Sequence, residues 1–168
     1  MDDAGVLVAV KNGHGEVCLM VEAPLDVDME QVCAEMVALV AEEVPAYQGA
    51  RPWELTVRVV GDDVVQGLNK EFRGKDAPTN VLSFENDDDG LEERWYVGDV
   101  MLAAPTVVRE AHATGRTVES HVRHLLVHGL LHLVGYDHME PVEAQAMEAL
   151  ETKILARAGV PNPYEDVE

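Results

Sequence analysis

The chain has 168 residues, of which 47% are hydrophobic and 26% are charged, as in folded proteins with a core of their own. This composition excludes a disordered chain, a collagen-like repeat and a disulfide-stapled miniprotein, since only Cys18 and Cys33 are available for pairing. The longest stretch without Asp, Glu, Lys or Arg, residues 124–136, is too short to cross a bilayer. The N-terminus is acidic where a secretory signal is basic, so we expect one cytoplasmic domain over residues 1–168 with reduced thiols.

The net charge of −20 is spread unevenly along the chain. Residues 1–44 carry −9, residues 85–99 carry −6 and residues 137–168 carry −6, whereas residues 45–84 are neutral and residues 100–136 carry +1. Acidic surface repels nucleic acid and anionic membranes. We therefore expect any anion-binding site in the two neutral to weakly basic segments.

Strand and helix patterns alternate along the first half of the chain. Two apolar runs around a turn signal at residues 11–15 predict a hairpin or two edge strands, and Asp26 or Asp28 can cap the helix that follows. In chain order, the predicted elements are strands at Val6–Val10 and Glu16–Val21, a helix at Met29–Val44, a strand at Leu55–Val60 and a helix that opens at Gly61-Asp62-Asp63 and ends near Arg73.

The second half mixes the same two kinds of element. In chain order we expect a strand at Asn80–Phe84, an acidic loop at Asn86–Glu93, a strand at Tyr96–Leu102, and helices at Ala104–Ala113, Val118–Val134 and Glu140–Ala158. Thr117 can cap the second of these helices, and Gly135 ends it. The irregular mixture of strands and helices predicts an α/β or α+β layer fold.

The most informative segment is His-Gly-Leu-Leu-His-Leu-Val-Gly-Tyr-Asp-His at residues 128–138. His128 and His132 stand four positions apart on a predicted helix and share one face, and Gly135 lets the chain turn back and present His138. Three imidazoles leave one position of a tetrahedral zinc ion open, which is typical of catalytic sites. The alternative, three unrelated histidines on a partly buried helix, is disfavoured by this spacing.

Metzincin proteases show the same spacing, but the residue after their first histidine is a glutamate that acts as the general base. Here that position is Gly129, which has no side chain to move a proton, so conventional metalloprotease chemistry is not expected. His121 and His124 fall near the same helix face. They either line a groove that leads to the metal or are solvated surface histidines.

A second cluster runs from Arg73 through a Gly/Pro turn into the predicted strand that ends at Phe84. Arg73 or Lys75 can hold a phosphate, although a cation at a helix end usually compensates the helix dipole. Arg73 lies 55 positions before His128 in the chain. The two meet only in a fold that lays the strand at Asn80–Phe84 beside the histidine helix.

Together these motifs resemble the YbeY family of bacterial metal-dependent endoribonucleases and ribosomal RNA maturation factors. The pattern H-G-x-L-H-L-x-G-Y-D-H stands at residues 128–138, R-G-K-D-x-P-T-N-V-L-S-F at residues 73–84, and G-D-[IVL] at residues 98–100. The resemblance runs from about Trp53 to Tyr164, which is most of the chain.

The resemblance implies an α/β (α+β) fold with a small mixed four-stranded sheet, a layer of helices and a metzincin-like metal site. It implies one Zn²⁺ ion per chain, and ribosomal RNA and the small ribosomal subunit as partners, with ribosomal proteins or assembly GTPases as further partners and no membrane. The site residues that the resemblance implies are the metal ligands His128, His132 and His138 and the catalytic Arg73. The helix face and the basic cluster add His121, His124 and Lys75 as expected RNA contacts.

Three functional hypotheses follow. The first is a single-strand-specific, metal-dependent endoribonuclease for 16S ribosomal RNA 3′-end maturation, late ribosome biogenesis and ribosome quality control. Arg73 would stabilise the pentacoordinate phosphorus, and the base would be the metal-activated water itself or a carboxylate, Asp99 or Asp137. Attack by water and attack by the ribose 2′-hydroxyl are equally open. The second hypothesis is a peptidase-like zinc hydrolase, and the third is a non-catalytic ribosome assembly factor.

Overall fold

The structure is a computed structural model that describes residues 5–10, 15–88, 90–137 and 139–164. Its elements agree with the predicted order, and most of their ends lie within two residues of the predicted ones. In chain order they are β1 (Val6–Ala9), β2 (Gly15–Val21), α1 (Met29–Glu43), the 3₁₀ helix η1 (Pro45–Tyr47), β3 (Trp53–Val60), α2 (Asp62–Arg73), β4 (Val81–Glu85), β5 (Trp95–Ala103), α3 (Ala104–Thr114), α4 (Val118–His132) and α5 (Pro141–Arg157).

A mixed sheet forms the middle layer, with strand order β1-β2-β3-β5-β4. Strands β2, β3 and β5 run parallel, and the edge strands β1 and β4 pair antiparallel with their neighbours. The predicted mixed α/β class is confirmed, but the four-stranded sheet is wrong, because the sheet has five strands. All five strands predicted along the chain join this sheet, and the edge strand β1 pairs with β2, where Val6 lies opposite Leu19. The turn between them at residues 11–14 lies outside the described residues.

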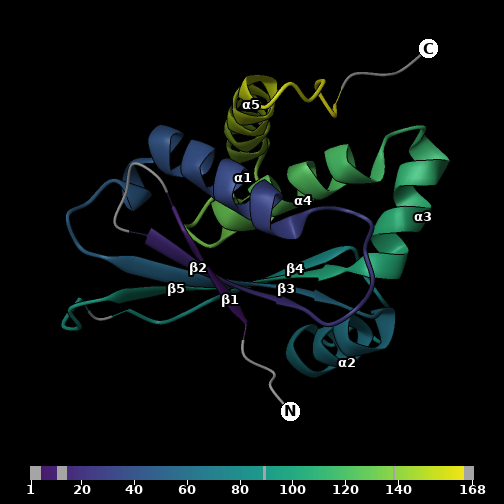
Figure 1. Cartoon of the computed structure of the whole chain (residues 1–168), viewed down its shortest axis with the longest axis horizontal. Helices are drawn as coiled ribbons and strands as arrows, with labels where there is room; N and C mark the ends of the chain where they lie inside the picture. Colours follow the sequence, from purple (N-terminus) through teal and green to yellow (C-terminus); the bar gives the residue numbers. More distant parts are fainter. Residues whose placement is uncertain (1–4, 11–14, 89, 138, 165–168) are drawn as a thin grey trace.

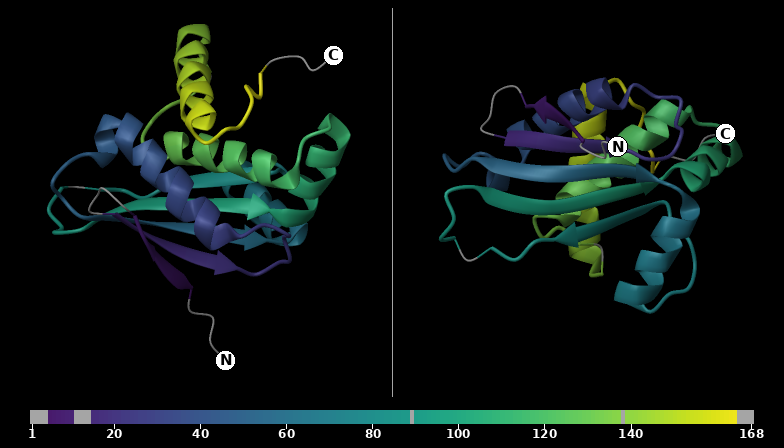
Figure 2. Two further views of the ribbon diagram at one scale, coloured as in Figure 1. Left: turned by 45° about the horizontal axis from the view of Figure 1, so that its top comes forward. Right: turned by 60° about the horizontal axis from the view of Figure 1, so that its bottom comes forward.

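Helices lie on both faces of the sheet (Figure 1). Helices α1 and α4 cover one face, and α5 packs on their outer side, whereas α2 lies on the opposite face near β4 and β5 (Figure 2). The large core contains Val100 and Leu102 of β5, and the small core under α2 contains Met101 and Ala103, as the alternation of a strand requires. No helix in the described ranges is long and apolar enough to cross a membrane.

Helix α4 begins at its predicted cap, where the Thr117 side chain accepts a hydrogen bond from the Ser120 amide at 3.1 Å. It ends at His132, two residues before the predicted end, because the amides of Val134 and Gly135 bond to carbonyls only three residues back. Gly135 then takes φ 98°, a conformation that other residues rarely adopt. The chain therefore leaves the helix directly after the second histidine, earlier than predicted, and Gly135 makes the predicted turn just beyond it.

Helix α2 is fixed at both ends. At its start, Asp62 accepts hydrogen bonds from the amide and hydroxyl of Thr106 and from Arg109, at 3.2, 2.8 and 2.9 Å. At its end, Gly74 takes φ 70°, and its amide bonds to a carbonyl of the last turn. This arrangement places Arg73, the last residue of the helix, next to the edge strand β4.

Candidate functional site

Gly129, between the two helical histidines, lets α4 lie directly against β4 and β5. A Cβ atom at this position would lie 2.8 Å from Cγ1 of Val100 and 3.0 Å from Oγ of Ser83. The Ser83 hydroxyl instead donates a hydrogen bond to the Gly129 carbonyl at 3.2 Å. Val100 and Ser83 of the sheet therefore occupy the space into which a side chain at residue 129 would extend. A glutamate, the general base of metzincin proteases at this position, does not fit there.

His128 and His132 lie side by side on α4. Their Nε2 atoms are 3.0 Å apart, and their ring centroids are 4.5 Å apart. Two nitrogens bound to one tetrahedral zinc ion at its usual bond length lie about 3.3 Å apart. The pair is therefore set up to bind one ion through both Nε2 atoms. The third predicted ligand, His138, lies outside the described residues.

Glu151 of α5 supports this pair and was missed by the sequence analysis. Its side chain is fully buried, and Oε2 lies 3.0 Å from Nδ1 of His128. Burial raises the pKa of Glu151, but hydrogen bonds with His124, His128 and Tyr164 outweigh this effect and lower the pKa to about 2. The ionised carboxylate accepts the Nδ1 proton of His128 and leaves Nε2 for a metal.

The donor set fits zinc. Neutral imidazole nitrogens are preferred zinc ligands, and a carboxylate on the far ring nitrogen is the usual outer partner of a zinc-binding histidine. Within the ranges that the structure describes, no three His, Cys, Asp or Glu side chains gather as a complete metal site. The histidine pair with its buried carboxylate is thus the described part of the predicted tripod.

A sequence signal for Glu151 was available. It stands four residues after Met147 and three before Ile154, on the apolar stripe with which α5 faces the core. A carboxylate in the middle of such a stripe is rarely buried without a partner. Its partner, however, comes from another helix, so the stripe alone does not identify His128.

A groove of about 920 Å³ runs along the edge strand β4, between the end of α2 and the end of α4. Arg73, Lys75, His128 and His132 all line it. The Arg73 guanidinium donates from Nη2 to the Ser83 carbonyl at 2.9 Å and lies 5.7 Å from the centre of the Phe84 ring. The structure thus brings Arg73 and the histidine pair into one groove, through the strand whose position the sequence analysis required.

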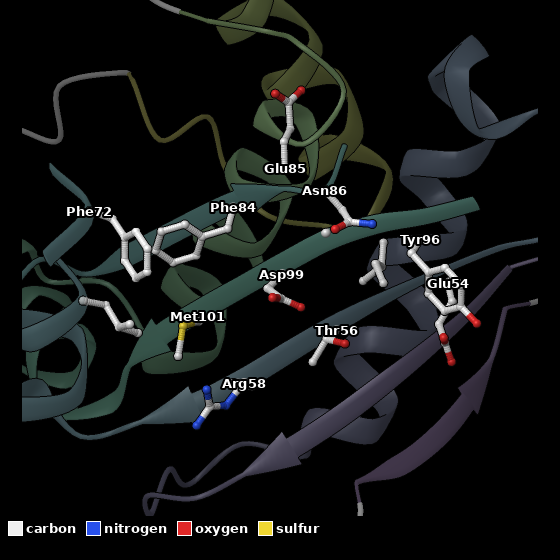
Figure 3. A pocket seen from close by; sticks show the side chains of 13 residues that line it. Glu54, Thr56, Arg58, Phe72, Phe84, Glu85, Asn86, Tyr96, Asp99 and Met101 are labelled. Carbon is white, nitrogen blue, oxygen red and sulfur yellow. The ribbon is translucent and has the colours of Figure 1, made fainter. Parts of the chain in front are cut away.

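Asp99 lies on the other face of the sheet, which corrects its candidacy as the base. In Figure 3 it lies on the sheet surface with Thr56, Arg58 and Met101, the side on which α2 packs. Burial raises the pKa of Asp99, against the opposing effects of a hydrogen bond with Thr56 and the charge of Arg58. Asp137 does line the groove with the histidines.

His121 and His124 do not line this groove, contrary to the alternative in which they line a groove that leads to the metal. His121 is only 6% exposed, and its Nε2 lies 2.9 Å from a carboxylate oxygen of Glu110 on α3. His124 points toward Tyr164 and Glu151, with its Nε2 3.3 Å from the Tyr164 hydroxyl. Both share a helix face with His128, but α3 and the C-terminal segment cover the first turns of α4.

Comparison with known proteins identifies the family. A family model described as "Endoribonuclease YbeY" matches residues 21–159. The chain belongs to this family. The resemblance expected from the motifs is confirmed, and with it the prediction of an endoribonuclease, at the level of the family.

Curated relatives in the endoribonuclease YbeY family cover most of the chain. The protein of Paramagnetospirillum magneticum is 46% identical over 144 residues, which are 82% of this chain and 85% of the relative. The protein of Halorhodospira halophila is 50% identical over 69% of this chain and 77% of its own length, and that of Alteromonas mediterranea 40% over 90% and 91%. The solution structure of TM1509 from Thermotoga maritima shares the fold, with a TM-score of 0.53 at 23% identity, over 89% of this chain and 97% of that one.

Proposed function

We propose that the chain is a zinc-dependent, single-strand-specific endoribonuclease of the cytoplasm that matures the 3′ end of 16S ribosomal RNA in late ribosome biogenesis and ribosome quality control. The observation that carries this proposal is the groove shared by Arg73 and the pair His128 and His132. The relatives named endoribonucleases support the class of reaction.

His128 and His132, together with His138, would hold one zinc ion at the end of α4. Zinc at such a site supplies Lewis-acid chemistry, which activates water and polarises a phosphoryl oxygen. Glu151 keeps His128 in the tautomer that presents Nε2 to the groove. The protein's own part is therefore to orient the ligands and to place the phosphodiester beside them.

Arg73 provides the charge for the phosphate. The Ser83 carbonyl accepts one of its N–H donors and fixes the guanidinium in the groove, on the same side as the histidines. A planar guanidinium can donate two parallel hydrogen bonds to phosphoryl oxygens as negative charge develops there. Lys75 adds a second cation to the same groove.

Of the two candidate carboxylates, Asp99 and Asp137, only Asp137 lines the groove. We assign Asp137 as the proton acceptor. It takes the proton from the attacking oxygen, either a water or the ribose 2′-hydroxyl. Product ends distinguish the two routes, because only attack by the 2′-hydroxyl gives a 2′,3′-cyclic phosphate.

Two contacts disfavour the peptidase-like alternative. Gly129 leaves no room for the glutamate on which metalloprotease chemistry depends. An extended peptide can bind by adding a strand to an exposed sheet edge, but in β4 the Ser83 carbonyl already accepts a hydrogen bond from Arg73. An RNA strand needs cations rather than a pairing edge, and the groove supplies Arg73 and Lys75.

The test compares purified protein on three substrates: a single-stranded RNA that carries the 16S 3′ region, the same RNA as a duplex, and a casein-type peptide. We expect zinc-dependent cleavage of the single strand alone. Peptide cleavage would support the second hypothesis, and RNA binding without any cleavage would support an assembly factor. Ribosomal proteins or assembly GTPases that bring the enzyme to the small subunit are the proposed protein partners.

A further inference from the structure

The hydrogen-bond network behind His128 continues past α5 into the C-terminal segment. The Tyr164 hydroxyl donates to Oε1 of Glu151 and lies 3.2 Å from Oε2, the oxygen that faces His128. Tyr164 is 43% exposed, yet its hydroxyl ends on a carboxylate that is fully buried. A partly exposed side chain at the end of the chain therefore contacts the outer partner of the metal site.

This segment is held in place independently of Tyr164's own side chain. Arg116 donates from Nη2 to the Pro163 carbonyl, and the Tyr164 amide donates to Oδ1 of Asn162 at 2.8 Å. Thr152 of α5 lies within 3.4 Å of the same Asn162 oxygen. Contacts other than that of the tyrosine hydroxyl therefore hold the backbone at residues 162–164.

We propose that Tyr164 and Glu151 are positioning residues that orient His128 for the metal, so that the C-terminal segment at residues 159–164 contributes to metal affinity. The proposal rests on the proposed function, because it concerns the same metal site. It assigns to this segment a role that the histidine motif does not contain.

The physical reason is the orientation of the Glu151 carboxylate. Oε2 has two nearby imidazole nitrogens, Nδ1 of His128 at 3.0 Å and Nε2 of His124 at 3.7 Å. The Tyr164 hydroxyl binds Oε1 and fixes the rotation of the carboxylate, which keeps Oε2 on His128. Without this donor, the carboxylate can turn toward His124, and His128 loses the partner that directs Nε2 to the groove.

Three variants of the full chain test the proposal: Glu151→Gln, Tyr164→Phe and Thr152→Val. Thr152→Val is the matched control, since it disturbs the Asn162 contact of the segment but leaves the Glu151 contacts in place. Zinc affinity is measured by competition with a chromophoric chelator. We expect an about 10- to 100-fold loss for Glu151→Gln, an about tenfold loss for Tyr164→Phe and less than a twofold change for Thr152→Val.

A second measurement separates positioning from general loosening. Nitrogen-15 NMR of the metal-free protein at neutral pH reports which ring nitrogen of His128 carries the proton. We expect Nδ1 in the native protein and a mixture of tautomers in Glu151→Gln. A loss of zinc affinity in Tyr164→Phe and Glu151→Gln with an unchanged His128 tautomer would assign the loss to loosening and overturn the proposal.

The remaining outcomes distinguish this proposal from the proposed function. Native zinc affinity in both Glu151→Gln and Tyr164→Phe, with affinity lost in His128→Ala, overturns the positioning role and leaves the metal site standing. If the unmodified protein binds no zinc, or if His128→Ala binds zinc as tightly as the unmodified protein, the metal site itself is wrong and both proposals fall.

Discussion

Arg73 donates a hydrogen bond to the Ser83 carbonyl at 2.9 Å, although its helix lies on the face of the sheet opposite to the histidine helix. The Ser83 hydroxyl in turn donates to the carbonyl of Gly129, the residue after His128. One residue of the edge strand β4 therefore connects the arginine and the histidines. This connection is possible because β4 is an edge strand, past which a long side chain can reach from the other face.

Replacement of Arg73 should separate catalysis from folding. We expect Arg73→Ala to keep its zinc content and its melting temperature, because an exposed side chain with one hydrogen bond contributes little to stability. The kcat/KM for RNA should fall about 10- to 100-fold, since a charge-assisted phosphate contact is lost. Arg73→Lys should recover only part of the loss. Arg157→Ala, at the end of α5, is the control; reduced stability with native activity in Arg73→Ala would make Arg73 a helix cap.

Removal of the histidines should remove the metal. We expect purified protein to hold about one zinc ion, and His128→Ala or His132→Ala to lose most of it, as measured by elemental analysis. A chelator should lower the melting temperature of the native protein, because the metal binds only the folded state. Free zinc at about 100 times its Kd raises the free energy of unfolding by about 2.7 kcal/mol. His112→Ala, on α3, is the control. Full zinc retention in both variants would rule out the tripod.

Gly129 should tolerate no side chain. Gly129→Ala is expected to lower the free energy of unfolding by about 1–3 kcal/mol, because its Cβ meets Val100 and Ser83 at 3.0 Å or less. Gly67→Ala in α2 is the matched control: nothing lies within 4 Å of its Cβ position, so it should gain about 0.5–1 kcal/mol. Urea unfolding measures both. A native-like Gly129→Ala would show that α4 does not lie this close to the sheet.

Asp62 should make stability depend on acid pH. Burial raises its pKa, but hydrogen bonds from Arg109 and Thr106 outweigh this effect and lower the pKa below 3.8. Its contribution is therefore present above pH 3.8 and is lost as the pH falls through the lower pKa of the folded state. We expect Asp62→Asn to cost about 1 kcal/mol at pH 7, with the difference from the native protein shrinking below pH 3.8.

Asp63→Asn is the control for this experiment, since it removes a carboxylate from the same first turn but keeps the bonds to Thr106 and Arg109. Unfolding in urea across the acid range gives the comparison. An Asp62→Asn variant whose deficit is the same at pH 3 and pH 7 would contradict the linkage.

RNA binding should depend only weakly on salt. The groove presents two cations, Arg73 and Lys75, and the rest of the chain is strongly acidic. If two phosphates of a single strand are neutralised, a plot of the logarithm of affinity against the logarithm of salt concentration has a slope of about −1.4. Fluorescence anisotropy over a salt series measures it. A slope several times steeper would require a larger basic surface than this groove.

Most of the fold followed from local pattern. Caps and glycines predicted the start of α4 at Thr117 and the turn at Gly135, because both depend on backbone bonds within a few residues. The last helical residue, His132, lies two residues before the predicted end. The strands of the N-terminal hairpin were also placed correctly, by two apolar runs on either side of turn residues. The number of strands in one sheet depends on which strands pair, and that information lies in long-range contacts.

The site was predictable only where its residues share one element. His128 and His132 needed only the helical period, so their pairing follows from spacing. The contact of Glu151 with His128 depends on how α5 packs on α4. The face of the sheet on which Asp99 lies depends on the alternation of β5, beside which β3 has a register shift at Glu54 and Leu55. The burial of His121 depends on packing in the same way, because α3 supplies the Glu110 carboxylate that lies beside it.

The central claim is that zinc at His128 and His132 drives RNA cleavage beside Arg73. Its most direct test is the cleavage rate of a single-stranded 16S 3′-end RNA as metal-free protein is titrated with zinc. We expect no cleavage without metal, full activity near one equivalent, and no recovery in His132→Ala. Equal cleavage in the presence of chelator, or zinc-restored cleavage in His132→Ala, would contradict the account.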